Sequence, residues 1–193
     1  MLFERIYLKK LYNISTDAWI EITVPYNNDA ILRDKSKAII IVPGGCYSSV
    51  SVREGDPVAI EYLKSGFITI VLHYSVKTAY PIPMLELAYA IDYLRNNAEK
   101  YYIDKNKICI IGFSAGGHLA AHYSTMYDCK EVREVFPESK SVNASVLCYP
   151  VITADKKYAH EGSFVNLVGH YPENEEELAY FSCEKNIDKM FLL

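Results

Sequence analysis

Short runs of consecutive apolar residues, separated by stretches with helical periodicity, constrain the fold of this chain more than any other feature. The runs that we expect to be strands cover residues 38–42, 67–72, 108–111 and 144–149, and residues 19–24 alternate like a half-buried strand. The helices expected between them cover residues 58–64, 83–94 and 116–127. Uninterrupted apolar runs suit strands that are covered on both faces. The alternation predicts an α/β fold with a doubly wound, mainly parallel sheet and helices on both faces.

Length and charge narrow the class of protein. The 193 residues fit one domain, 1–193, and the net charge of −4 argues against a nucleic-acid partner. No run approaches the ~20 apolar residues of a membrane span, and the first residues lack the apolar run of a signal peptide. Five scattered cysteines without a C-x-x-C pair predict free thiols, no metal site and a cytoplasmic location. No cofactor is expected.

The sequence Gly112-Phe-Ser-Ala-Gly116 fits the G-x-S-x-G pattern and lies between an expected strand and an expected helix. A serine at the apex of such a turn adopts a strained backbone, and Gly112, Gly116 and Gly117 supply the small residues that the turn needs. The turn would present the hydroxyl of Ser114 at the end of the sheet and aim the N–H of Ala115 at a developing oxyanion. The alternative is a glycine-rich connection of the kind found in nucleotide-binding sheets.

A second glycine-containing turn follows the first expected buried strand, at Val42-Pro-Gly-Gly-Cys-Tyr47. Consecutive glycines let backbone N–H groups turn inward without side chains in the way, which would add oxyanion donors. Taken alone, the segment would be an ordinary turn, but its pairing with the serine turn favours the oxyanion role.

Four segments in matching order resemble a known group of enzymes: Pro43-Gly-Gly-Cys-Tyr47, Tyr80-Pro-Ile-Pro83, Ile103-Asp104 and Gly112-Phe-Ser-Ala-Gly-Gly-His-Leu119. Together they resemble α/β-hydrolase carboxylesterases of the acetyl-esterase and acetyl-xylan-esterase-like kind, which are related to hormone-sensitive-lipase-like esterases. The resemblance implies the α/β-hydrolase fold, with Ser114 as the nucleophile and the N–H groups of Ala115, Gly45 and Cys46 as the oxyanion hole. That family usually has a third glycine where this chain has Cys46.

The resemblance also implies an acid and a histidine base on loops after later strands, in the chain order Ser, Asp or Glu, His. We expect the chain to be truncated before those strands, with residues 151–186 forming a cap-like segment over the substrate site. Within the chain, Asp155, His160 and His170 are the weaker candidates for acid and base. The other histidines, His73, His118 and His122, are expected to be structural.

Two functions follow. The first is a serine hydrolase that cleaves short acyl esters, with acetylated carbohydrate as one candidate substrate, through an acyl-enzyme on Ser114. The alternative is a catalytically inactive truncated homologue or binding protein. A nucleotide-binding module is disfavoured because neither G-x-G-x-x-G nor the Walker lysine is present. The apolar strand at 144–149 would be an exposed edge, which favours self-association.

Overall fold

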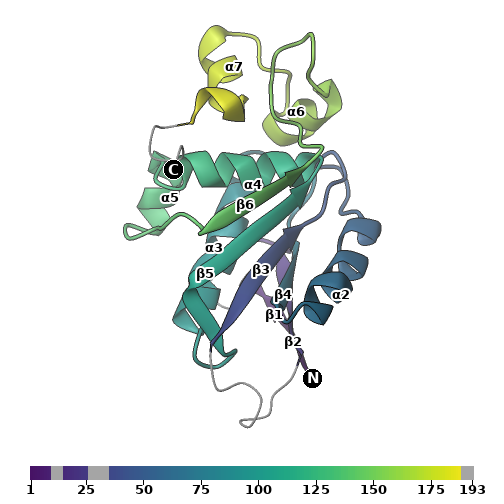
Figure 1. The fold of residues 1–193 in the computed structure, drawn as a ribbon. Helices are drawn as coiled ribbons and strands as arrows, with labels where there is room; N and C mark the ends of the chain where they lie inside the picture. Colours follow the sequence, from purple (N-terminus) through teal and green to yellow (C-terminus); the bar gives the residue numbers. More distant parts are fainter. Residues whose placement is uncertain (10–14, 26–34, 188–193) are drawn as a thin grey trace.

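The computed structural model describes residues 1–9, 15–25 and 35–187, and these form a six-stranded mixed sheet (Figure 1). The strands are β1 (Leu2–Tyr7), β2 (Trp19–Val24), β3 (Ser36–Val42), β4 (Ile68–His73), β5 (Ile103–Phe113) and β6 (Ala144–Cys148). Their order in the sheet is β1-β2-β4-β3-β5-β6. The pairs β4–β3, β3–β5 and β5–β6 are parallel, whereas β1–β2 and β2–β4 are antiparallel. The predicted mainly parallel α/β sheet is confirmed.

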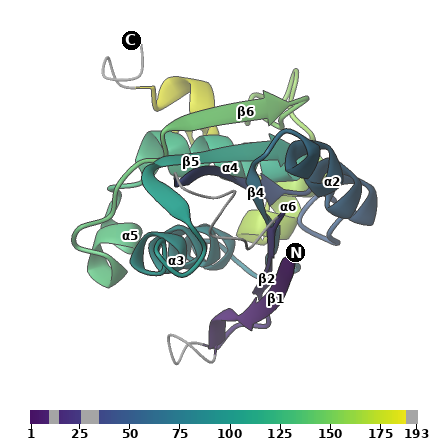
Figure 2. The ribbon, with the colours of Figure 1, turned by 60° about the horizontal axis from the view of Figure 1, so that its bottom comes forward.

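Helices cover both faces of this sheet (Figures 1 and 2). They are η1 (Val52–Glu54), α2 (Asp56–Lys64), α3 (Ile82–Asn96), α4 (Ala115–Met126) and α5 (Lys130–Val135). Alternate residues of β3 separate two cores: Ile40 packs in the larger cluster with residues of α3 and α4, whereas Ile39 and Ile41 pack with Ala59 of α2. This two-sided burial is the physical reason that β3 has no polar residue between Ala38 and its end.

Two local features differ from the sequence expectation. The segment Leu2–Tyr7 is a strand at the antiparallel edge, where charged and apolar residues alternate between exposed and half-buried positions. Its charges concealed it from a search for apolar runs. The sequence Asp56-Pro57 predicts an N-cap at Asp56 with Pro57 as the first helical residue, but this prediction is wrong, because Asp56 is the first residue of α2 and Gly55 is its N-cap.

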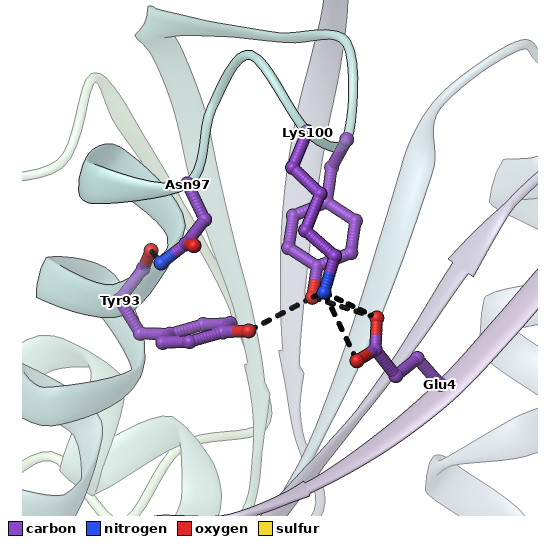
Figure 3. A network of polar contacts seen from close by, with 5 residues as sticks. Glu4, Tyr93, Asn97 and Lys100 are labelled. Atoms are coloured by element: carbon purple, nitrogen blue, oxygen red, sulfur yellow. Dashed lines mark hydrogen bonds and ion pairs between the residues drawn. The ribbon is translucent and has the colours of Figure 1, made fainter. Parts of the chain in front are cut away.

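A network of polar side chains ties the edge strand β1 to the turn between α3 and β5 (Figure 3). The hydroxyl of Tyr101 donates to Glu4 Oε2 at 2.9 Å and contacts the hydroxyl of Tyr93 at 2.9 Å. Lys100 Nζ donates to the same carboxylate at 2.9 Å, and together with Tyr101 it holds the pKa of Glu4 below its ordinary value. The network stabilises the end of the sheet away from the strand tips that carry the candidate site.

The segment after β6 lies beyond the end of the sheet toward which the parallel strands point (Figure 1). It contains α6 (Glu161–Val168), α7 (Glu175–Phe181) and η2 (Cys183–Lys185). The backbone N–H of Tyr80 donates to Leu167 O at 2.7 Å, and the N–H of Cys183 donates to Ile152 O at 2.9 Å. The first bond attaches the segment to the loop between β4 and α3, and the second lies within the segment.

Strand β6 lies at the other edge of the sheet and has one partner, β5, among the described residues. Residues 144–147 are exposed, including Val146 at 44% and Leu147 at 38%, and β6 carries no charged residue. Edge strands without charge, proline or bulge expose unpaired backbone groups to other chains. The edge expected at residues 144–149 is therefore exposed in the part of the chain that the structure describes.

Candidate active site

Ser114 occupies a sharp turn between β5 and α4. Its backbone has φ 51° and ψ −118°, a conformation that costs a non-glycine residue about 1–3 kcal/mol. Two backbone bonds hold the turn to the end of β6: the N–H of Ser114 donates to Cys148 O at 3.0 Å, and the N–H of Val151 donates to Ser114 O at 3.1 Å. The side chain is partly exposed and makes no hydrogen bond to the described residues. The hydroxyl is therefore presented rather than buried.

The glycines around Ser114 are required by steric crowding. A Cβ on Gly112 would lie 2.8 Å from Ala120 Cβ, and one on Gly117 would lie 2.8 Å from Pro150 Cβ. A Cβ on Gly116 would collide with the backbone oxygens of Val42 and Pro43. The first turn of α4 is thus packed directly against the chain that leaves β3.

The segment that follows β3 passes beside Ser114 because β3 and β5 are parallel neighbours, with Val42 opposite Gly112. A Cβ on Gly44 would lie 3.0 Å from Ser114 Cβ and 2.7 Å from Phe113 O. The loop 43–47 therefore touches the serine turn through the bare backbone of Gly44.

The backbone of this loop turns through three successive positive φ angles, 128° at Gly45, 57° at Cys46 and 56° at Tyr47. The carbonyl of Gly45 accepts from the N–H groups of Ser48 and Ser49 at 2.9 and 3.0 Å. Among the described residues, no acceptor is bound to the N–H groups of Gly45 or Cys46. The N–H of Ala115, at the first position of α4, has no intrahelical acceptor.

Buried contacts of His118 hold the loop against α4. Its Nδ1 lies 2.8 Å from the hydroxyl of Tyr47, and its Nε2 lies 3.0 Å from the carbonyl oxygen of Phe181. Because a carbonyl can only accept, Nε2 carries the proton and Nδ1 accepts from Tyr47. Burial lowers the pKa of His118 to about 4, so the ring is neutral and structural. The loop is also held from above, where Asn166 Nδ2 of α6 donates to Cys46 O at 2.9 Å.

Two further histidines have structural contacts. The ring of His73 stacks on Trp19 with 4.5 Å between centroids, and its Nε2 lies 3.2 Å from Glu21 Oε2. His122 is buried, with Nε2 lying 3.1 Å from Met126 Sδ, and burial lowers its pKa well below the ordinary value.

The weaker acid and base candidates are held by local contacts in the segment after β6. Asp155 is exposed, and its Oδ1 accepts from the N–H of Lys157 at 2.9 Å. His160 Nδ1 lies 3.0 Å from Ser163 Oγ. His170 Nε2 lies 3.2 Å from Glu177 Oε2 and lowers the pKa of that carboxyl. Within the described part of the chain these three residues are not bonded to one another or to Ser114.

Away from Ser114, the described residues form a cavity, but neither a metal-ligand cluster nor a membrane-spanning helix. A cavity of about 480 Å³ lies between α3 and residues 135–140, and Ser114 does not line it. Across residues 1–9, 15–25 and 35–187, no group of three His, Cys, Asp or Glu side chains could hold a metal ion. In the same ranges, no helix is long and apolar enough to cross a membrane.

A mixed α/β sheet with a strained serine between a parallel strand and a helix defines an α/β-hydrolase. The family model BD-FAE matches residues 21–182, and the chain belongs to this family of carboxylesterase-type ester hydrolases, which is acetyl-xylan-esterase-like. The fold class and the family resemblance expected from the sequence are therefore confirmed.

Three similar proteins illustrate the relationship. The chain is 34% identical over 170 residues to endo-1,4-beta-xylanase B of Butyrivibrio fibrisolvens, which covers 83% of this chain and 26% of that protein. It is 36% identical over 135 residues to an acetylxylan esterase of Xylanibacter ruminicola, covering 69% and 26%. The structure of an acetyl ester-xyloside bifunctional hydrolase from Caldicellulosiruptor lactoaceticus has a TM-score of 0.80 and 28% identity, covering 96% and 70%. The chain thus spans about a quarter of the length of these two curated relatives.

Proposed function

We propose that this chain bears the nucleophile of a serine carboxylesterase that cleaves short acyl esters through an acyl-enzyme on Ser114. One observation carries the proposal: Ser114 is partly exposed on a strained turn, directly beside a loop in which the N–H groups of Gly45 and Cys46 have no acceptor among the described residues. The second candidate function, a non-catalytic homologue or binding protein, is favoured by a different observation. No described histidine is bonded to Ser114.

In the proposed mechanism, Ser114 Oγ attacks the ester carbonyl carbon while a base removes its proton. The carbonyl oxygen becomes an oxyanion, which accepts hydrogen bonds from the N–H groups of Ala115, Gly45 and Cys46 at the positive end of α4. Collapse of this intermediate expels the alcohol and leaves the acyl group on Ser114. Water then attacks the acyl-enzyme and releases the acid.

The base and acid are the open part of this proposal. The weaker candidates Asp155, His160 and His170 each have their contacts within their own segment, and none is bonded to Ser114. We propose that the full triad uses groups other than the described residues. The described residues by themselves would then supply the residual catalysis, roughly 10³–10⁴-fold over water, that oxyanion stabilisation and binding give in serine hydrolases without their triad.

The substrate class in this proposal is a small-molecule ester, with acetylated carbohydrate as the preferred candidate. The support is the naming of two similar proteins, an acetylxylan esterase and an acetyl ester-xyloside hydrolase. A cytoplasmic location belongs to the same proposal and is supported by five free cysteines.

Hydrolysis of p-nitrophenyl acetate by the wild type, Ser114→Ala and the control Ser65→Ala tests the proposal. Ser65 is an exposed serine at the end of α2, so its variant should match the wild type. We expect Ser114→Ala to lose the part of the rate that needs the serine hydroxyl and to keep the residual catalysis that oxyanion stabilisation gives. Equal rates for all three proteins would exclude serine catalysis, and acetate release from acetylated xylo-oligosaccharides would separately test the substrate class.

A further inference from the structure

The carboxylate of Glu54 joins two parts of the candidate site that are far apart in the sequence. Its Oε2 accepts a hydrogen bond from the backbone N–H of Gly44 at 2.8 Å, and its Oε1 accepts from the hydroxyl of Tyr149 at 2.7 Å. Gly44 belongs to the loop after β3, whereas Tyr149 follows β6. We infer that Glu54 is a positioning residue that fixes the loop 43–47 beside Ser114 and determines which of its N–H groups face the substrate.

A closed ring of contacts carries this inference. The backbone of Ser114 is bonded to Cys148 O and to the N–H of Val151, on either side of Tyr149. Tyr149 then reaches across to Glu54, and Glu54 reaches Gly44. The ring closes where the bare backbone of Gly44 meets Ser114. Each contact limits the separation between the serine and the loop, so the ring fixes that separation more tightly than any one bond.

The backbone is strained at Tyr149, which indicates that the closed ring of contacts needs this residue in its observed position. Tyr149 has a φ of 37°, in the left-handed region that non-glycine residues rarely adopt. The residue is 66% exposed and its ring lies 5.9 Å from that of Phe113, so deep burial does not explain its position. The hydrogen bond to Glu54 raises the pKa of Tyr149 to about 12, which agrees with the hydroxyl acting as the donor in this bond.

The bond to Glu54 also removes one donor from the oxyanion site. A carboxylate holds an N–H more strongly than a neutral acceptor does, so Gly44 is not available to a substrate oxygen. The N–H groups of Gly45 and Cys46, which have no acceptor among the described residues, remain free for that role. This selection rests on the proposed function, because it matters for an oxyanion only if Ser114 attacks an ester.

A direct role for Glu54 as base is not supported by its contacts. Both of its oxygens accept hydrogen bonds, and neither bond involves the hydroxyl of Ser114. The carboxylate and the serine both approach Gly44, since a Cβ there would lie 2.9 Å from Glu54 Oε2 and 3.0 Å from Ser114 Cβ, but no hydrogen bond joins them.

Amide hydrogen exchange and the ¹⁵N–¹H spectrum of Gly44 test the inference without any activity. The variants are Glu54→Ala, Glu54→Gln and Tyr149→Phe, with Glu61→Ala as control because Glu61 is an exposed acid that pairs with Lys64 on α2. We expect Glu54→Ala to speed exchange at Gly44 about 10- to 100-fold and to shift its resonance upfield. The conservative Glu54→Gln, which keeps an acceptor, should restore most of the protection, and Tyr149→Phe should give a smaller loss in a folded protein. Unchanged Gly44 exchange in both Glu54→Ala and Tyr149→Phe would overturn the inference.

Kinetics on p-nitrophenyl acetate provide the second readout. Loss of loop positioning should lower kcat about 10- to 100-fold in Glu54→Ala and leave KM nearly unchanged, because the donors act mainly in the transition state. Glu54→Gln should recover part of that kcat, and Glu61→Ala should match the wild type. If wild type and Ser114→Ala react equally, the proposed function fails, whereas the Gly44 exchange still decides the role of Glu54.

Discussion

The serine turn and the segment after β6 lie at the same end of the sheet, but different kinds of contact hold them in place. Around Ser114, backbone packs directly on backbone, and glycines at 112, 116 and 117 leave no room for a side chain. In α6, by contrast, a Cβ on Gly162 would approach only the ring of His160, at 3.6 Å. Asp155 and His160 bond to close neighbours in sequence. The nucleophile is thus fixed by the fold, whereas these acid and base candidates are fixed by local contacts.

The largest expected effect on the free energy of unfolding comes from a glycine-to-alanine substitution at the serine turn, compared with the same substitution in α6. Gly116→Ala should destabilise the protein by about 4 kcal/mol or more, because the new Cβ must displace the backbone at Val42 and Pro43. Gly162→Ala, at an open position inside α6, should stabilise by about 0.5–1 kcal/mol. Urea unfolding of both variants checks the contrast. Similar free energies of unfolding would remove the distinction between the regions.

A smaller effect should appear with pH. Burial lowers the pKa of His118 to about 4, whereas the unfolded chain has a value near ~6.5. The neutral ring therefore contributes its full stabilisation above pH 6.5, and that contribution is lost as the pH falls toward 4, because the unfolded chain takes up the proton first. Between pH 7.5 and 4.5 the loss from His118 should be about 2–3 kcal/mol.

Two variants decide whether this pH dependence of stability comes from the buried His118 or from a histidine in the segment after β6. His118→Gln keeps a donor and an acceptor but does not titrate, so it should reduce the loss. His170→Gln removes an exposed histidine that pairs with Glu177 and should leave the loss as in the wild type. Urea midpoints at the two pH values provide the measurement, and a loss that vanishes with His170→Gln would contradict the assignment.

The strain in the loop beside Ser114 should be detectable at about 1 kcal/mol. Cys46 has a φ of 57°, which a glycine adopts without the cost that a side chain brings. Cys46→Gly should therefore raise the free energy of unfolding and preserve ester hydrolysis. Cys109→Gly removes a thiol from the extended strand β5 instead and should lower it. Calorimetric melting of both variants checks the opposite signs.

The exposed edge of β6 should affect association more than stability. We expect the protein to self-associate as its concentration rises, because residues 144–147 carry no charge and have no described strand on the side away from β5. Val146→Lys should weaken that association and change the stability of the monomer by no more than about 0.5 kcal/mol. Sedimentation velocity over a concentration series provides the measurement. A wild type that stays monomeric throughout would contradict this expectation.

Features encoded by neighbouring residues could be predicted from the sequence. Runs such as 38–42 indicate buried strands because every position is apolar, and Gly112 to Gly117 indicates the serine turn because its crowding permits only small residues. The strand Leu2–Tyr7 could not be predicted from apolar runs, because the adjacent charges Glu4 and Arg5 interrupt it. Local pattern therefore fixed the centre of the sheet better than its antiparallel edge.

Contacts between distant residues could not be predicted from one sequence. Nothing near Asn166 indicates that its amide reaches Cys46, since 120 positions separate them. The bond between Glu54 and Tyr149 likewise depends on β3 and β6 flanking β5. His118 was expected to be structural, but its link between Tyr47 and Phe181 required coordinates.

The most direct test of the central claim is the reaction of Ser114 with a p-nitrophenyl phosphonate ester, followed by intact mass and peptide mapping. The folded protein should gain one phosphonyl group on the peptide that contains Ser114, and the same chain unfolded in urea should react far more slowly. A folded protein that reacts no faster than the unfolded chain, or that carries the group on another residue, would contradict the claim that the fold activates this serine.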